Sequence, residues 1–119
     1  GLVEMDQAGA EVAWCSPPTR CTGHVRRVAH LWSGVLQGGE KSERRLHPTQ
    51  KPIAVQRQIV EWYAPPGGLV ADWYMGAGAV IIACEQTGRI GHGMDIAPAY
   101  LAATLERLST RGLVPRLVQ

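Results

Sequence analysis

The chain has 119 residues, of which 45% are hydrophobic and 18% are charged, and its formal net charge is +2. This length corresponds to one domain or part of one, and the hydrophobic content excludes a disordered chain. The sequence contains no apolar run as long as a membrane span, and its three cysteines lack a disulfide-like pattern, which indicates a reducing cytoplasm.

Positive charge is concentrated in residues 20–57, where eight Lys and Arg stand against two acidic residues. Such a basic segment is typical of a surface that contacts a phosphate backbone, although a solvated basic face would have the same composition. Two readings therefore stay open for this segment. The residues that we consider for contact with nucleic acid are Arg20, Arg26, Arg27, Arg44 and Arg45.

The first 46 residues carry weak structural signals. Residues 11–15 alternate as in a short strand, which Pro17 and Pro18 would end. Residues 25–36 fit an apolar helical stripe, but a strand over residues 31–36 fits as well, and the pattern does not decide between them. We assign residues 1–46 to a basic segment of strand and loop, and residues 47–119 to an α/β core.

The core begins with a helix and a strand. Pro52 is suited to the first turn of a helix, because proline lacks the N–H that would be unsatisfied there. The helix presents Ile59, Val60 and Tyr63 inward and ends before the prolines at 65 and 66. The short apolar run of residues 69–71 then predicts a buried strand.

A glycine-containing loop follows this strand. Asp72 ends the strand, Gly76 and Gly78 come next, and an apolar run from residue 79 continues as a helix to Gly88, which suits the position just past a helix C-terminus. A strand, a glycine loop and a helix form a site for an anionic or nucleotide-like ligand, because backbone N–H groups at the helix N-terminus point into the loop. The glycines let the backbone approach that ligand closely.

A second strand over residues 90–94 also ends on an acid, Asp95, which is placed to bind two ribose hydroxyls. Pro98 suits the first turn of a last helix that Gly112 closes. Its predicted apolar stripe consists of Tyr100, Leu101, Leu105 and Leu108. The order helix, strand, helix, strand, helix predicts a parallel sheet with right-handed crossovers.

Taken together, these motifs closely resemble one family. They are His47-Pro-Thr-Gln-Lys-Pro52, Asp72-x-x-x-Gly76-x-Gly78, Cys84-Glu-Gln-Thr-Gly-Arg89 and Gly93-x-Asp95-Ile-x-Pro98-x-Tyr100. The set resembles the C-terminal half of amino-methylating DNA methyltransferases, which use S-adenosylmethionine to modify adenine N6 or cytosine N4. The motif order is similar to the beta-type arrangement, and a weaker likeness around residues 13–14 and 30–34 is to short phage-borne members.

The resemblance implies a fold and a set of roles. The fold is α/β, a partial Rossmann-like methyltransferase sheet, mostly parallel, with helices on both faces. Asp95 would bind the ribose of the cofactor, and Thr49 and Lys51 would contact its methionine carboxylate, where an ammonium group is a sensible partner. The loop residues that would hold the methionine part of S-adenosylmethionine are Asp72, Tyr74, Gly76 and Gly78.

The sequence departs from the family pattern in the loop. Asp-Pro-Phe is replaced by Asp72-Trp73-Tyr74, and Gly-Ser-Gly-Thr by Gly76-Ala77-Gly78-Ala79. The last helix starts with Ala97-Pro98 rather than Ser-Pro, and loss of a helix cap costs about 1 kcal/mol. These differences predict a weakened or reshaped pocket.

The catalytic motif of the family is a second departure. Family members are expected to carry Asp, Asn or Ser followed by Pro-Pro and an aromatic residue that stacks the flipped base. The partial match is Ser16-Pro17-Pro18-Thr19, where Thr19 cannot stack, so Ser16 is a weak catalytic candidate. Because this match is poor, we expect the catalytic half to lie upstream and to be missing here. The chain begins at Gly1 rather than Met, and we expect its natural start to lie elsewhere.

The resemblance predicts a cytoplasmic DNA methyltransferase of a bacterial or phage-infected cell, represented by its cofactor-binding half. Its partners would be double-stranded DNA and an upstream half, a partner chain or a second copy, and no membrane. One alternative is a degenerate, non-catalytic remnant that binds DNA or protein. Another is a nicotinamide-binding oxidoreductase, but its fingerprint needs glycine where Ile81 stands. No metal is expected, because Cys15, Cys21, His24 and His30 lack the short spacing of a zinc hook.

Overall fold

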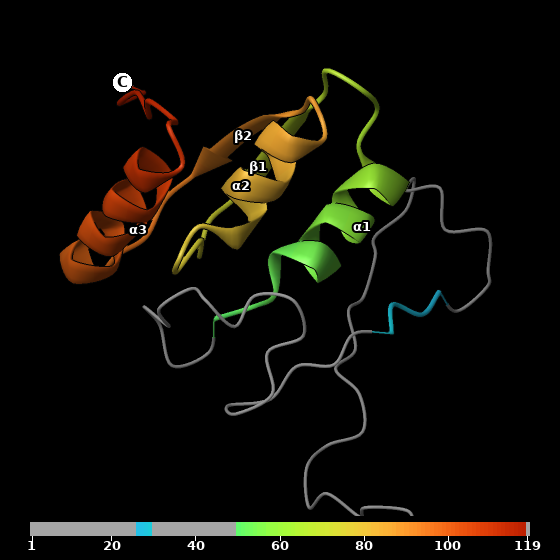
Figure 1. The fold of residues 1–119 in the computed structure, drawn as a ribbon, viewed down its shortest axis with the longest axis horizontal. Coiled ribbons are helices and arrows are strands. Elements are labelled where there is room, and N and C mark those ends of the chain that lie inside the picture. Colours follow the sequence, from blue (N-terminus) through green and yellow to red (C-terminus); the bar gives the residue numbers. More distant parts are fainter. Residues whose placement is uncertain (1–25, 30–49, 119) are drawn as a thin grey trace, which may run out of the picture.

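The computed structural model describes residues 26–29 and 50–118, and five elements follow one another within them. They are α1 (Ile53–Tyr63), β1 (Leu69–Asp72), α2 (Ala79–Gln86), β2 (Ile90–Gly93) and α3 (Pro98–Thr110), as Figure 1 shows. This order confirms the helix and strand alternation predicted from residue 52 onward. The expected strand at residues 11–15 and most of residues 25–36 lie outside the described residues.

The two strands form a parallel pair. The register runs from Leu69 opposite Ile90 to Asp72 opposite Gly93. The ladder continues past the strands, because the N–H of Met94 donates to the carbonyl of Asp72 at 3.0 Å. The carboxyl ends of both strands therefore meet at one edge of the sheet, and α2 makes the crossover that a parallel pair requires.

The hydrophobic core lies between the three helices and one face of this sheet. In Figure 1 α2 lies between α1 and α3, and it crosses in front of the strands. The buried residues of the cluster come from all three helices, namely Ile53, Val60, Ala79, Ile82, Ala83, Cys84 and Leu108. Cys84 is fully buried and packs in this cluster as a small apolar side chain.

The other face of the two strands is exposed. Val70 and Gly91 face α2, whereas Leu69 is 63% exposed and Ile90 is also exposed. The prediction that residues 69–71 are a buried strand is therefore wrong for Leu69 and Ala71, because successive side chains alternate between two faces and α2 covers one of them. The α/β class is confirmed, and helices on the second face stay a prediction.

The turns agree with the glycine and proline positions of the sequence. Gly88 follows α2 with φ +66° and Gly112 follows α3 with φ +75°, the left-handed region that ends many helices. α3 begins at Pro98, as expected. Arg89 joins the end of α1 to the turn after α2, since its guanidinium donates to the carbonyl of Ala64 at 2.8 Å from Nη2.

The buried face of α3 differs from the predicted apolar stripe. Leu101 and Leu105 are exposed, and the buried positions are Thr104, Arg107 and Leu108. The prediction is confirmed for Leu108 and wrong for Leu101 and Leu105. Two polar side chains of the helix instead turn inward and bind backbone carbonyls. Within the described residues, no helix is both long and apolar enough to cross a membrane.

Candidate functional site

The loop between β1 and α2 has a backbone conformation that depends on glycine. Gly76 has φ +52° and Gly78 has φ +72°. The loop is closed by the N–H of Gly78, which donates to the carbonyl of Met75 at 2.8 Å. The N–H of Met75 donates to the carbonyl of Met94 at 3.1 Å, which ties the loop to the end of β2. The carboxyl edge of the sheet and the glycine loop thus form one unit.

The N-terminus of α2 opens into this loop without a side-chain cap. Gly78 is the N-cap residue, and neither a capping side chain nor an acidic residue in the first turn neutralises the helix end within the part of the chain that the structure describes. The first N–H groups of a helix have no partner inside the helix and carry partial positive charge. The helix end is therefore uncapped at the position that the glycine spacing predicted, and helix ends of this kind favour anions.

Asp95 connects the second strand to the glycine loop. Its Oδ2 accepts a hydrogen bond from the N–H of Gly76 at 3.0 Å, and its Oδ1 accepts one from the N–H of Ala97 at 2.8 Å. The structure thus brings together the two motifs that the sequence placed 19 residues apart. Both oxygens of this carboxylate therefore bind backbone N–H groups next to the glycine loop.

Asp72 has a different role in the loop. Its Oδ1 accepts a hydrogen bond from the N–H of Tyr74 at 3.0 Å, which turns the chain just past β1. The Tyr74 side chain is 88% exposed, and Trp73 beside it is exposed as well. Two large aromatic rings therefore project from the loop into solvent at the point where the family pattern has Pro-Phe.

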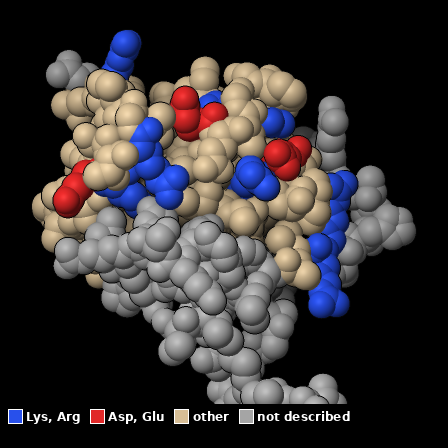
Figure 2. All heavy atoms as spheres, viewed as in Figure 1, with Lys and Arg blue, Asp and Glu red and all other residues tan. Residues whose placement is uncertain are grey.

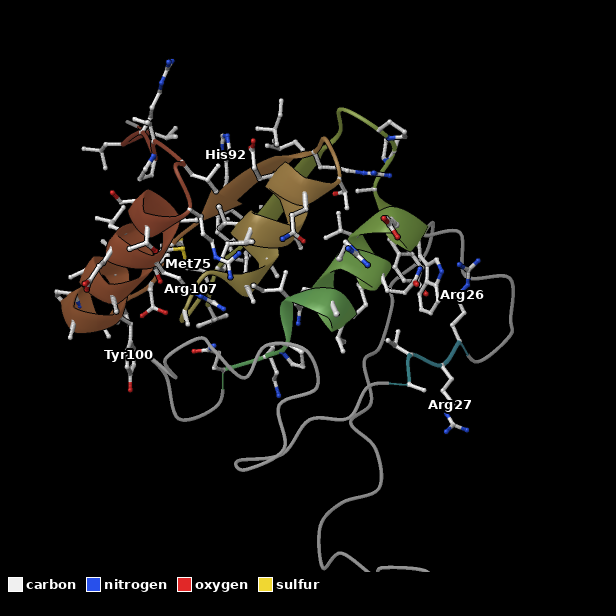
Figure 3. All side chains as sticks on the ribbon, in the orientation of Figure 1. Arg26, Arg27, Met75, His92, Tyr100 and Arg107 are labelled. Atoms are coloured by element: carbon white, nitrogen blue, oxygen red, sulfur yellow. The ribbon has the colours of Figure 1, made fainter. Side chains whose placement is uncertain are left out.

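Two buried side chains of α3 form hydrogen bonds with carbonyl groups of the glycine loop. Thr104 Oγ1 donates to the carbonyl of Gly76 at 2.6 Å, and Arg107 Nη1 donates to the carbonyl of Ala77 at 2.7 Å. Thr104 is 0% and Arg107 3% exposed. Figure 3 shows Arg107 and Met75 in the space between α3 and α2.

Sequence reasoning missed Thr104 and Arg107, because hydrophobic periodicity scores only the apolar positions. A signal was present: the two residues are three apart, which places them on one side of a helix. Of the residues predicted for the cofactor carboxylate, Lys51 is exposed just before α1, and Thr49 lies outside the described residues. Ser16 lies outside them too.

Of the arginines predicted to contact nucleic acid, the structure describes Arg26 and Arg27. Arg26 lies over the rings of Trp62 and Tyr63, with its guanidinium carbon 5.3 Å and 5.7 Å from the two ring centroids. Figure 3 shows Arg26 at this aromatic pair and Arg27 turned away from it. On the face drawn in Figure 2, Lys and Arg are interspersed with Asp and Glu over the described surface. Arg20, Arg44 and Arg45 lie outside the described residues.

No group of three or more His, Cys, Asp or Glu side chains within residues 26–29 and 50–118 could hold a metal ion. Burial raises the pKa of the Cys84 thiol above its ordinary value, while the nearby positive charge of Arg89 lowers it and the negative charge of Asp72 raises it. The thiol is therefore a protonated core group rather than a reactive one.

The fold and the loop define a class of protein, and comparisons of the sequence agree with it. Residues 9–106 match the sequence model of the N6/N4 DNA methylases. The chain belongs to this DNA methylase family. The match begins at residue 9, so it includes the Ser16-Pro17-Pro18-Thr19 segment.

Individual relatives of the chain are a methylase and a methyltransferase by name. The chain is 32% identical over 72 residues to "Putative methylase YubD" of Escherichia coli K12, which covers 60% of this chain and 32% of that protein. It is 32% identical over 93 residues to "Type II methyltransferase M.ScaI" of Streptomyces caespitosus, covering 75% of this chain and 31% of that protein. The chain thus spans about a third of the length of these relatives.

Among solved structures, the fold is similar to that of the "M1.HpyAVI-SAM complex", with a TM-score of 0.51 and 32% identity. This likeness covers 52% of the present chain and 30% of the other. The solved structure of the cytosine-N4-specific PvuII DNA methyltransferase, 22% identical with a TM-score of 0.50, has the same fold.

Proposed function

We propose that the chain is the S-adenosylmethionine-binding half of a DNA methyltransferase that acts on adenine N6 or cytosine N4. The observation that carries this proposal is the connection between Asp95 and Gly76, which joins a ribose-binding position to an uncapped helix N-terminus through one hydrogen bond of 3.0 Å. The relative solved in complex with SAM supports the same cofactor.

The residues present fit this cofactor. The open N-terminus of α2 and the loop at Gly76 and Gly78 would hold the methionine carboxylate, since anions bind at such helix ends. Asp95 would accept hydrogen bonds from the ribose hydroxyls, since a carboxylate oxygen can accept more than one hydrogen bond. Thr49 and Lys51 would close over the carboxylate. The cofactor would supply an electrophilic methyl group, and the chain would bind and orient it.

A calorimetric titration with S-adenosylhomocysteine, S-adenosylmethionine and NAD tests this proposal. We expect the first two to bind and NAD to bind far more weakly. Asp95→Asn should weaken binding by about 1–3 kcal/mol, because one acceptor oxygen is replaced by a donor. Glu106→Gln, which removes an exposed charge from α3, is the matched control and should leave affinity unchanged. Equal affinity of both variants, or a preference for NAD, would refute the assignment.

We further propose that the base-binding motif is supplied outside residues 1–119, by an upstream segment or a partner chain. Methyl transfer needs the cofactor methyl aligned with an amino nitrogen of a stacked, hydrogen-bonded base. Ser16-Pro17-Pro18-Thr19 has no aromatic residue at the stacking position. The chain alone should therefore transfer no tritiated methyl groups to duplex DNA. Robust transfer that is lost in Ser16→Ala would overturn this proposal, and absence of cofactor binding would favour a non-catalytic remnant.

Double-stranded DNA is the proposed partner of the basic segment at residues 20–57. Counterion release predicts that log affinity falls linearly with log salt, in proportion to the phosphates contacted. A variant with four charge reversals should lose binding while the core of residues 69–112 stays folded, as circular dichroism would measure. The reversed residues are Arg26, Arg27, Arg44 and Arg45. Unchanged DNA affinity in that variant would identify the segment as a solvated face.

A further inference from the structure

We propose that α3 is a positioning element for the glycine loop, and that Thr104 and Arg107 set the direction in which the loop presents its backbone N–H groups. The inference rests on the proposed cofactor site, because it assigns a cause to the geometry of that site. Both side chains are almost completely buried, and both donate to loop carbonyls.

The two contacts act on consecutive peptide groups. Thr104 Oγ1 binds the carbonyl of Gly76 at 2.6 Å, and Arg107 Nη1 binds the carbonyl of Ala77 at 2.7 Å. In a planar trans peptide the carbonyl and the next N–H point in opposite directions. Holding the Gly76 carbonyl against α3 therefore directs the N–H of Ala77 away from α3.

The Ala77 N–H is the group that this arrangement leaves for a ligand. The N–H of Gly76 is already bound to Asp95, and that of Gly78 is bound to the carbonyl of Met75. The N–H of Ala77 makes no hydrogen bond within residues 26–29 and 50–118, although the residue is buried. Buried N–H groups are almost always paired, so an unpaired one beside an open helix N-terminus indicates a donor reserved for an acidic ligand group.

Close packing adds a second constraint on the same loop. A Cβ placed on Gly78 would lie 2.6 Å from Cγ2 of Thr104. Thr104 thus fixes the loop in two ways, with its hydroxyl on Gly76 and its methyl against Gly78. The methyl sets the distance between α3 and the loop, and the hydroxyl sets the orientation of the peptide.

Two substitutions at one position separate these contributions. Thr104→Val keeps the shape of the side chain and removes the donor, whereas Thr104→Ser keeps the donor and removes the methyl. We expect Thr104→Val to weaken S-adenosylhomocysteine binding about fivefold, which is about 1 kcal/mol. Thr104→Ser should stay within about twofold of the native affinity, because the hydrogen bond is retained.

A third variant tests whether lost stability alone explains the effect. Ile82→Val shortens a buried side chain of α2 without touching the loop carbonyls, and should lower the unfolding midpoint without changing affinity. Arg107→Lys should also weaken binding, since lysine cannot reproduce the reach of the guanidinium. Equal loss of affinity in Thr104→Val and Ile82→Val would overturn the positioning role.

Nuclear magnetic resonance of the ligand-free chain keeps this inference separate from the proposed function. Thr104→Val should move the resonances of the Gly76 carbonyl and the Ala77 amide, because these two groups belong to the peptide that is released from α3. Thr104→Ser and Ile82→Val should leave both unchanged. Native resonances in Thr104→Val would refute the positioning role, whereas absence of ligand binding with these shifts present would refute only the cofactor assignment.

Discussion

Replacing Gly78 by alanine should lower the free energy of unfolding more than the same replacement at a left-handed glycine with open surroundings, such as Gly88. Gly78 has φ +72°, and the added Cβ would lie 2.6 Å from Cγ2 of Thr104. Gly88 has a similar φ of +66°, but nothing lies within 4 Å of its Cβ position. The two positions therefore share the backbone strain and differ in the clash.

The expected magnitudes follow from these two contributions. A left-handed conformation costs an L-residue about 1–2 kcal/mol, which is the expected loss for Gly88→Ala. Overpacking adds about 1–3 kcal/mol at Gly78, because Thr104 is fully buried and cannot move aside freely. Gly78→Ala should thus lose about 2–5 kcal/mol of unfolding free energy, the sum of the two contributions.

Urea unfolding of a double-mutant cycle measures the clash directly. Thr104→Ser removes Cγ2, so in that background Gly78→Ala should cost no more than Gly88→Ala does. The coupling energy between residues 78 and 104 should then be about 1–3 kcal/mol. Equal costs for the two alanine variants in the native background, or additive costs of Gly78→Ala and Thr104→Ser, would refute the reasoning.

Two further stability predictions concern the core and the turn after α2. Burial raises the pKa of the Cys84 thiol, so the unfolded chain releases this proton at lower pH than the folded chain does. The corresponding stability is fully present below the unfolded pKa and is lost as pH rises through the folded pKa. Urea midpoints should therefore fall above about pH 9 in the native chain and fall less in Cys84→Ala, and equal slopes would contradict this. Arg89→Met should lower the free energy of unfolding by about 1–3 kcal/mol, because the carbonyls of Ala64 and Thr87 lose their donors. The control Arg57→Met, at an exposed position, should change it by less than about 0.5 kcal/mol in the same urea assay.

The sequence was a good guide to the backbone where a residue type limits conformation. Gly88 and Gly112 ended helices, and Pro98 began one, because each of these residues allows few alternatives at a helix terminus. The position of Asp95 beside the glycine loop followed from parallel strands whose carboxyl ends share an edge.

The sequence was a poorer guide to the surroundings of each side chain. An apolar run predicted that Leu69 is buried, but burial depends on what covers each face of the sheet, and that is a property of the tertiary structure. Likewise, Thr104 and Arg107 are polar residues that bind carbonyls far away in the sequence, 28 residues away for Thr104 and 30 for Arg107. Periodicity within a helix carries no information on such partners. The binding and catalytic roles of all the predicted site residues stay predictions, and Thr49, Ser16, Arg20, Arg44 and Arg45 also lie outside the described residues.

Asp95 accepts hydrogen bonds from two backbone N–H groups, and this limits how the site could be redesigned or could diverge in evolution. Changing the acid that meets the ribose is an obvious route to a different cofactor preference in α/β proteins. Asp95, the acid proposed for this role, holds the N–H groups of Gly76 and Ala97, so that route would also loosen the glycine loop. Selection for altered ligands would then act first on Trp73 and Tyr74, whose exposed rings can be exchanged without disturbing any hydrogen bond of the loop backbone. Sequence variation at this edge should accordingly accumulate at the aromatic pair before it reaches the acid.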